Sequence, residues 1–331
     1  MGIIEIVFWI SISLVIYSTI IYPFLLNLFK KNNYDVDENY LPTVTLIICA
    51  YNEEKNILKK LKNVQELDYP FEKMQVILAD DGSNDNTVEI AKNYNFINIL
   101  SLDRSGKTSA QNESVKIAEN DILVFSDANS IYHQNAIKKL VRNFADKRIG
   151  VVCGELRYHE QRSEESMYWN YEIAIKKGES RNGWLIGANG SIYAVRRESY
   201  IPLPKDSISD HLEPIKIYGN GLDIIYESEA VAIEDPPENV LLRKRRIILR
   251  SLTSIKYILN ELNPLRKSSI YIPYVSHKLI RWFSPLFLIL IFLTNSLLIN
   301  QSNMYLFMFC SQILFYLFGL IISPIRYFLK V

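Results

Sequence analysis

Three long apolar segments, one near the start of the chain and two near its end, set the strongest constraint on its fold. Residues 3–29 (IIEIVFWISISLVIYSTIIYPFLLNLF) contain Glu5 as their only charge, and residues 282–299 and 304–325 contain none. A helix needs about 20 consecutive apolar residues to cross a bilayer, and uncharged runs of this length favour membrane spans over buried core helices. The first run lacks the basic start and the small-residue cleavage site of a signal peptide. We therefore expect three transmembrane helices.

Basic residues indicate the orientation of these spans. They lie on both sides of the central region and after the last span, at Lys30, Lys31, Lys278, Arg281, Arg326 and Lys330. The short loop at residues 300–303 carries no charge. Lysine and arginine are enriched on the cytoplasmic flanks of membrane spans. We therefore expect a multi-pass protein of the cell membrane whose central region and C-terminus are cytoplasmic and whose N-terminus and short loop are outside.

The remaining composition fits one substantial globular domain. The chain has 331 residues and a net charge of +1 at pH 7, which argues against a nucleic-acid partner because such proteins usually carry a basic excess. Cys49, Cys153 and Cys310 lack the spacing of a metal site or a redox pair. We expect all three to be small buried apolar residues.

Apolar runs typical of buried strands alternate with helical patterns through the first half of the central region. After a polar linker at residues 31–42, strands are expected near residues 43–50, 74–79, 97–102 and 121–126, each followed by a helix. Ile57, Leu58, Leu61 and Val64 would share one face of the first helix. Strands that alternate with helices pair in parallel, so the predicted fold class is α/β with a mostly parallel sheet.

Polar side chains gather where each of these strands ends. The four segments are residues 51–54 (YNEE), 80–83 (DDGS), 103–107 (DRSGK) and 127–129 (DAN). Each segment alone could be an ordinary helix cap or turn. Ligands of such sheets bind beyond the carboxyl ends of the strands, so four polar segments on one rim indicate a binding site.

Two features distinguish the second half of the central region. Gly187, Ala188 and Gly190 would let a ligand approach the backbone closely, although the same glycines fit a hairpin turn. Residues 241–281 begin with a basic run and continue with apolar residues at helical spacing. We expect this segment to be an interfacial helix on the inner leaflet, with its basic side chains near lipid phosphates.

Seven motifs, in order along the chain, give the sequence a family resemblance: TLIICAYNEE, ILADDGSNDNT, GKTSAQN, LVFSDANS, GANGSIYAVRR, SDHLEP and RKRRI. Together they cover about residues 43–250, and the sequence resembles the membrane-bound inverting glycosyltransferases of family 2. The resemblance implies a GT-A catalytic domain at residues 43–240. It would be flanked by transmembrane helices at residues 1–30, 282–300 and 304–331, the last with a cytoplasmic tail.

The resemblance also implies roles for individual residues. Asp210 matches the base that takes the proton of the acceptor hydroxyl, and Gly187, Asn189 and Gly190 lie on the acceptor side. The residues that match donor-binding positions are Tyr51, Glu53, Asp80, Asp81, Lys107, Asp127, Asn129 and Arg246. Asp127 matches the first aspartate of the family's Asp-x-Asp motif, which holds a divalent metal, Mg²⁺ or Mn²⁺.

Four positions depart from the family pattern, and one of them is Arg243, which stands in the glutamine position of Gln-x-x-Arg-Trp. Asn129 replaces the second aspartate of Asp-x-Asp. Because Mg²⁺ is often bound by one carboxylate together with substrate phosphates, we favour a working but weaker metal site over a dead one, with Asn129 as a neutral ligand or a partner of the donor. Ser209 precedes Asp210 where many relatives have an acidic residue. Ile247 replaces the tryptophan of Gln-x-x-Arg-Trp, which puts processive synthesis in doubt.

The expected function is hexosyl or N-acetylhexosaminyl transfer from a UDP-sugar to a polysaccharide or lipid-linked acceptor at the cytoplasmic membrane face, in cell-surface polysaccharide synthesis. Three spans are few for a polysaccharide channel, which favours a lipid-linked acceptor or an export partner. One alternative is a membrane-bound nucleotidyltransferase, which would release pyrophosphate. Another is a catalytically silent subunit of a polysaccharide-export complex.

Overall fold

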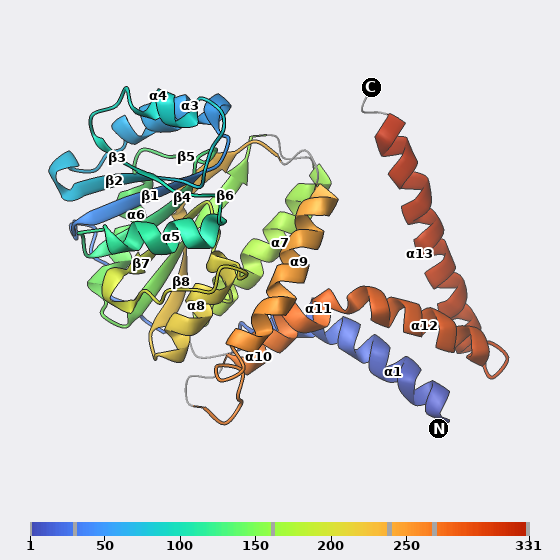
Figure 1. The fold of residues 1–331 in the computed structure, drawn as a ribbon. Helices are drawn as coiled ribbons and strands as arrows, with labels where there is room; N and C mark the ends of the chain where they lie inside the picture. The colour runs from blue at the N-terminus through green and yellow to red at the C-terminus, as the bar shows by residue number, and fades with distance from the viewer. Residues whose placement is uncertain (1, 29–31, 160–162, 237–239, 267–269, 329–331) are drawn as a thin grey trace. The chain divides into compact units, whose positions relative to one another are not determined.

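The computed structural model describes residues 2–28, 32–159, 163–236, 240–266 and 270–328. The chain divides into two compact units (Figure 1). A helical unit is formed by Met1–Leu25 and Val275–Val331, and an α/β unit is formed by Leu26–Tyr274. Each unit has a hydrophobic core of its own.

Apolar helices make up the helical unit. They are α1 (Ile3–Ile16), η1 (Tyr17–Ile21), α2 (Tyr22–Leu25), η6 (Tyr274–Leu279), α11 (Ile280–Trp282), α12 (Ser284–Leu298) and α13 (Asn303–Phe328). Phe8 packs with Ile291 and Leu298 of α12 and with Tyr305 of α13. Tyr305 also donates a hydrogen bond of 3.2 Å to Glu5. The one charged side chain of the first apolar run therefore has a partner within its own unit.

One helix in the described part of the chain, Ile3–Leu25, is long and apolar enough to cross a membrane by itself. A second candidate is a bent pair, Tyr271–Trp282 with Ser284–Leu298, and a third apolar helix, Asn303–Gly319, is shorter. These helices lie where the three spans are predicted. Among the residues that the structure describes, the first is the one unbent helix that is long and apolar enough to cross a membrane. A three-span arrangement therefore stays a prediction.

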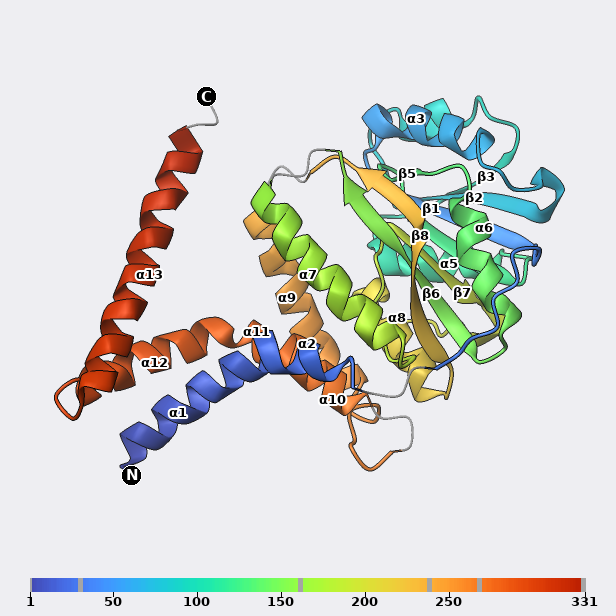
Figure 2. The ribbon, with the colours of Figure 1, turned by 180° about the vertical axis from the view of Figure 1, so that it is seen from behind.

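An eight-stranded sheet forms the centre of the α/β unit (Figure 2), in the order β3-β2-β1-β4-β7-β6-β8-β5. Its strands are β1 (Val44–Ala50), β2 (Met74–Asp80), β3 (Ile97–Ser101), β4 (Ile122–Asp127), β5 (Ile131–Tyr132), β6 (Ile149–Tyr158), β7 (Ile192–Arg196) and β8 (Asp223–Glu234). The first four pair in parallel, as predicted from the alternation of strands and helices. β7 runs antiparallel to both of its neighbours, and β6 and β8 pair in parallel. The mostly parallel α/β fold is confirmed.

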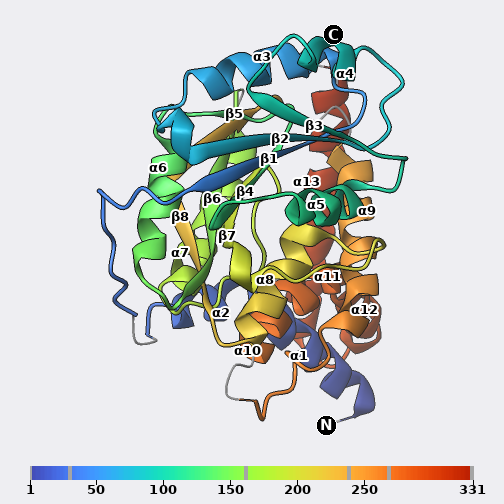
Figure 3. The same cartoon turned by 60° about the vertical axis from the view of Figure 1, so that its left-hand side comes forward.

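Helices cover both faces of this sheet (Figure 3). The helices of the α/β unit are α3 (Glu54–Gln65), α4 (Thr87–Ala91), α5 (Lys107–Lys116), α6 (Ala136–Val141), α7 (Ser163–Ser180), α8 (Ser209–Gly219), α9 (Val240–Ser254) and α10 (Tyr271–Pro273), with the short 3₁₀ helices η2 (Phe71–Lys73), η3 (Arg142–Ala145), η4 (Arg197–Ser199) and η5 (Ile255–Tyr257). Of these, α9 and α10 do not lie against the sheet. Leu46 and Ile48 of β1 belong to the core that includes α3 and α6. Ile47 and Cys49 belong to the opposite core, which includes residues of α5 and α8. This alternation is the two-residue period of a strand, and it leaves β1 buried along its whole length.

Two predictions about burial were wrong. Leu58 is exposed, and Lys60 takes a place in the buried face of α3 instead. The reason is geometric, since Lys60 lies three residues after Ile57 and on the same face, whereas Leu58 is turned by about 100°. Cys49 and Cys153 are buried as expected, but Cys310 is exposed on α13.

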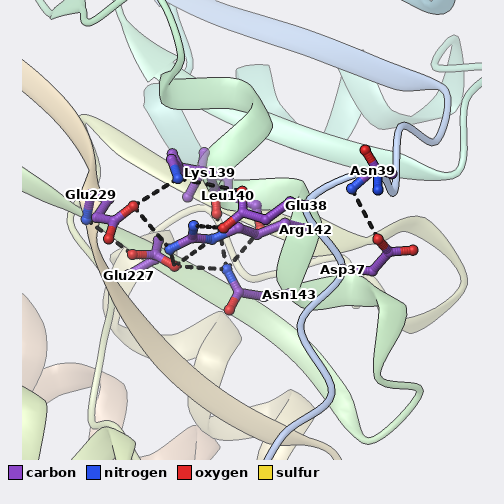
Figure 4. Close-up of polar contacts among 9 residues, drawn as sticks. All are labelled: Asp37, Glu38, Asn39, Lys139, Leu140, Arg142, Asn143, Glu227 and Glu229. Atoms are coloured by element: carbon purple, nitrogen blue, oxygen red, sulfur yellow. Dashed lines mark hydrogen bonds and ion pairs between the residues drawn. The ribbon is translucent and has the colours of Figure 1, made fainter.

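The polar segment predicted as a linker is fixed along the α/β unit in its described part, residues 32–42. Glu38 pairs with Arg142, and with Lys139 at 3.4 Å. Arg142 also binds Glu227 at 2.8 Å and Glu229 at 3.2 Å (Figure 4). We call these five residues the linker clamp. It holds the chain leading into β1 against α6, η3 and β8.

Candidate active site

The carboxyl ends of β1, β2 and β4 meet at one edge of the sheet because the three strands are parallel and in register. Ala50 pairs with Asp80, and Cys49 pairs with Asp127. Five of the predicted donor-binding residues therefore lie at or just beyond this edge: Tyr51, Glu53, Asp80, Asp81 and Asp127.

Lys107 links this edge to the second half of the unit. It is the first residue of α5, and its ammonium forms an ion pair with the carboxylate of Asp127. The same ammonium donates a hydrogen bond of 3.0 Å to the carbonyl of Gly190. Burial lowers the pKa of Lys107, but the carboxylates of Asp127 and Asp210 outweigh burial and raise it above its usual range. Lys107 is therefore a fixed positive charge between two acidic residues.

Gly190 is the point at which Lys107 and Asp210 approach each other. A methyl group at position 190 would lie 2.7 Å from Oδ2 of Asp210 and 3.0 Å from Nζ of Lys107. Such contacts are too close for a side chain, so only glycine fits without displacing one of the two. The sequence indicated a close approach at this glycine, and the residues that make it are the two charged side chains.

Asp210 lies in the first turn of α8, which begins at Ser209 with Ile208 at the N-cap position. Its carboxylate lies against Gly190, where Nζ of Lys107 also lies. The carbonyl of Asp210 accepts the N–H of Ala188 at 2.6 Å. Burial raises the pKa of Asp210, and the Lys107 cation partly offsets this effect. The carboxylate is thus placed beside a cation, which a role limited to capping the helix does not require.

Glu213, one turn further along α8, is buried and lies apart from this cluster of charges. Its side chain is 1% exposed, and it accepts a hydrogen bond of 3.1 Å from the hydroxyl of Tyr193. Burial raises the pKa of Glu213 to about 8, and the hydrogen bond from Tyr193 only partly opposes this shift. Glu213 is therefore protonated at neutral pH and has no access to an acceptor hydroxyl.

Asp81 organises the loop that follows β3. Its buried carboxylate accepts the backbone N–H groups of Ser105 at 2.7 Å and Gly106 at 2.9 Å, and it pairs with the guanidinium of Arg104. The same guanidinium lies 3.5 Å from the ring centroid of Tyr51. Arg104 thus lies against the ring of Tyr51, a predicted donor-binding residue. Arg104 belongs to the polar segment 103–107 but was not among the predicted site residues.

Asp80 and Glu53 have more local partners. Asp80 accepts the N–H of Ser83 at 3.2 Å, which closes the turn after β2. Glu53 accepts the side-chain amide of Asn56 at 2.7 Å, and burial raises its pKa. Both carboxylates shape the rim of the site.

On the acceptor side, Asn189 is held by three contacts. Its side-chain amide donates to the carbonyl of Gly154 at 2.5 Å, its backbone N–H lies 3.1 Å from Sγ of Cys153, and its Oδ1 accepts from Lys176 at 2.6 Å. Gly187 adopts a φ of +87°, a conformation that favours glycine. The segment GANG (residues 187–190) is thus a turn and also lies close to Asp210. The prediction of a hairpin turn and the prediction of a close approach are therefore compatible.

Asp127 and Asn129 differ in their surroundings. Asp127 is partly exposed and pairs with Lys107, while Asn129 is exposed and lines a small pocket together with Lys59, His159 and Glu234. Among the residues that the structure describes, no three His, Cys, Asp or Glu side chains converge as metal ligands. A single accessible carboxylate fits a Mg²⁺ or Mn²⁺ ion that takes most of its ligands from a bound diphosphate and water. It does not fit an ion enclosed by protein ligands alone.

Arg246 lies in α9, but its side chain is outside the described part of the structure. Its predicted place beside the donor diphosphate therefore stays a prediction.

The comparisons with known proteins agree with this arrangement. The model of glycosyl transferase family 2 matches residues 45–201. The poly-beta-1,6-N-acetyl-D-glucosamine synthase of Staphylococcus aureus is 29% identical over 248 residues, which cover 71% of this chain and 59% of that protein. The chain carries a glycosyl transferase family 2 region at residues 45–201.

Two further relatives define the extent of the similarity. A probable glycosyltransferase of Bacillus subtilis, YdaM, is 27% identical over 259 residues, covering 70% of this chain and 62% of the relative. The chain thus spans about three fifths of the length of these curated relatives. A mannosyltransferase from Pyrobaculum calidifontis, solved with GDP-Man and Mn²⁺, superposes with a TM-score of 0.76 at 20% identity and covers 94% of this chain and 92% of its own. This match confirms the GT-A fold.

Proposed function

We propose that the protein is an inverting glycosyltransferase that moves a sugar from a UDP-sugar to a polysaccharide or lipid-linked acceptor. The cluster of Asp127, Lys107 and Asp210 at the carboxyl edge of the sheet carries the proposal. It combines a carboxylate for a base, a fixed cation for a phosphate and a carboxylate for a metal. The name of the Staphylococcus aureus relative favours an N-acetylhexosamine as the transferred sugar.

In this mechanism the acceptor hydroxyl attacks the anomeric carbon of the donor. Its oxygen forms the new glycosidic bond while the bond between that carbon and the diphosphate breaks, and UDP leaves from the opposite face. The configuration of the carbon is therefore inverted. Asp210 takes the hydroxyl proton, and the raised pKa of this carboxylate makes it a better base than a fully solvated aspartate.

The charge that develops on the leaving diphosphate needs compensation. Lys107 is fully charged and fixed by two partners, so it can contact the diphosphate without reorganising. A divalent metal, held by Asp127 together with the donor diphosphate and water, would supply further positive charge to the leaving group. Tyr51 and Arg104 would bind the uracil, and Asp80, Asp81 and Glu53 would shape the surrounding loops.

The membrane arrangement is part of the same proposal. The helical unit would anchor the protein in the cell membrane through three spans, with the α/β unit in the cytoplasm where nucleotide-sugars are made. The amphipathic segment at residues 241–281 would contact membrane lipid. The acceptor would then be lipid-linked, or a polysaccharide passed to an export partner.

An assay of UDP release tests the activity. Membranes containing the full chain would be supplied with UDP-GlcNAc, UDP-glucose, UDP-galactose and GDP-mannose in the presence of Mn²⁺ and of lipid extract as the acceptor source. We expect UDP release with one UDP-sugar, and UDP-GlcNAc is the first candidate. Release of pyrophosphate would instead indicate a nucleotidyltransferase, and no turnover with any donor would indicate a silent subunit.

A further inference from the structure

Lys60 on α3 is a lysine without solvent exposure, directly behind the loop that carries Asp127. Its ammonium donates to Oγ of Ser126 at 2.7 Å and to the carbonyl of Ser130 at 2.5 Å. It also lies 4.0 Å from the ring centroid of Tyr132. An ammonium has three N–H donors and no acceptor, so two of its donors have hydrogen-bond acceptors and the ring of Tyr132 is a further neighbour of the cation.

The partners of Lys60 stand at the two ends of one functional loop. Ser126 precedes Asp127, and Ser130 follows Asn129. The hydroxyl of Ser126 donates to the carbonyl of Asp127 at 3.1 Å. Lys60 therefore binds both ends of the segment 126–130, and Asp127 lies between these two contacts.

A buried network continues from this loop to the turn at Gly190, which packs against Asp210. The hydroxyl of Ser130 donates to Glu234 at 2.5 Å, and the hydroxyl of Ser191 donates to the same carboxylate oxygen. Tyr132 donates to the carbonyl of Ser191 at 3.1 Å. Ser191 directly follows Gly190, the residue packed against Asp210 and Lys107. The donor loop and the acceptor-side turn are thus joined through Lys60, Tyr132 and Glu234.

Burial of a cation is costly in stability. Burial lowers the pKa of Lys60 to about 7, against the opposing effect of Asp127 and Glu234. A side chain that costs stability but closes a functional loop is better explained by positioning than by packing. This loop, the segment 126–130, also contains Asn129, which replaces the second aspartate of the family's Asp-x-Asp motif.

We propose that Lys60 is a positioning residue that fixes the segment 126–130 so that Asp127 can hold the divalent metal that binds the diphosphate of the donor. The inference rests on the proposed function, because it assigns Lys60 a part in donor binding. Lys60 does not contact the donor, and its effect is transmitted through Ser126 and Ser130.

Lys60→Met tests the proposal, because methionine keeps most of the length and burial and removes the three donors. Lys62→Met, at an exposed position on the same helix, is the matched control. Binding of UDP in the presence of Mn²⁺ would be measured by calorimetry on the full chain in detergent, together with KM and kcat for the sugar donor. We expect Lys60→Met to weaken Mn²⁺-dependent UDP binding and raise the donor KM by about tenfold or more, with kcat within about threefold. UDP binding equal to that of Lys62→Met would overturn the proposal.

A second variant covers the case in which Lys60→Met does not fold. Ser126→Ala keeps the lysine and removes one of its acceptors, and we expect a smaller but measurable loss of Mn²⁺-dependent UDP binding. Unchanged binding in Ser126→Ala would then overturn the proposal. If the unaltered chain binds UDP with Mn²⁺ but transfers no sugar, the proposed function fails and the role of Lys60 is still decided by binding. If it transfers sugar and Lys60→Met keeps the same KM and UDP affinity, the inference about Lys60 alone fails.

Discussion

Among single residues, Asp210 and Glu213 show how burial distinguishes two acidic side chains of one helix. They lie three residues apart on α8, and a sequence alone leaves both as candidates for the proposed base. The carboxylate of Asp210 lies against Gly190 and near Lys107, whereas Glu213 is enclosed with Tyr193. The choice between them rests on burial, which no local pattern of residues reveals.

The titration of Glu213 gives a prediction about stability. Its pKa is about 8 in the folded chain against 4.5 for an ordinary glutamate, so between these values the folded state retains a proton that the unfolded state loses. The free energy of unfolding should therefore fall as pH rises through this window. Glu213→Gln mimics the protonated acid and should lose this dependence. The thermal midpoint of the variant minus that of the unaltered chain should therefore increase from pH 5 to pH 8. Parallel curves across this range would show that Glu213 is ionised when folded.

The metal site gives a second prediction at this scale. Asp127→Ala removes the one accessible carboxylate of the loop and should abolish sugar transfer at any practical Mn²⁺ concentration. Asn129→Asp adds a second carboxylate, so activity should saturate at a lower Mn²⁺ concentration than in the unaltered chain. A titration of activity against Mn²⁺ measures both effects. Substantial turnover by Asp127→Ala would mean that this loop does not bind the metal.

At the scale of elements, the alternation of strands and helices predicted β1 to β4 and the edge at which the site lies. The strands β6 and β8 were not predicted, because each carries buried acidic side chains within an apolar pattern. Glu155, Glu227 and Glu234 are buried in these strands. Their partners are far away in the sequence, such as Arg142 for Glu227 and Ser130 for Glu234. Lys60 escaped prediction for the same reason, although its spacing from Ile57 placed it on the buried face.

The linker clamp gives a prediction about how the elements are held together. Arg142→Met leaves Glu227 buried without its cation, which typically costs about 3–5 kcal/mol. We expect a thermal midpoint several degrees lower and faster proteolysis within residues 32–42. Lys138→Met is the control, because its pair with Asp68 is largely exposed and such pairs contribute about 1 kcal/mol or less. Equal midpoints for the two variants would show that the clamp contributes little.

For the whole molecule, hydrophobic runs and basic flanks predicted a helical unit and its orientation, and the structure shows two compact units. The number of spans is harder to predict, because a break between Trp282 and Ser284 bends the second candidate. The positions of lysine and arginine predict that a reporter fused after Val331 is cytoplasmic. A cysteine introduced at Ser302, in a background with Cys310→Ser, should react with a membrane-impermeant reagent from outside. Labelling of the C-terminus from outside would overturn this topology.

The central claim is that Asp210 is the base of a sugar transfer reaction, and Asp210→Asn tests it most directly. An amide keeps the size of the carboxylate and can still cap a helix but cannot take up the proton of the acceptor. We expect this variant to fold and to bind UDP with Mn²⁺ like the unaltered chain, yet to lose at least about a hundredfold in turnover, while Asp206→Asn, at an exposed aspartate just before α8, keeps its activity. Near-normal sugar transfer by Asp210→Asn would contradict the account.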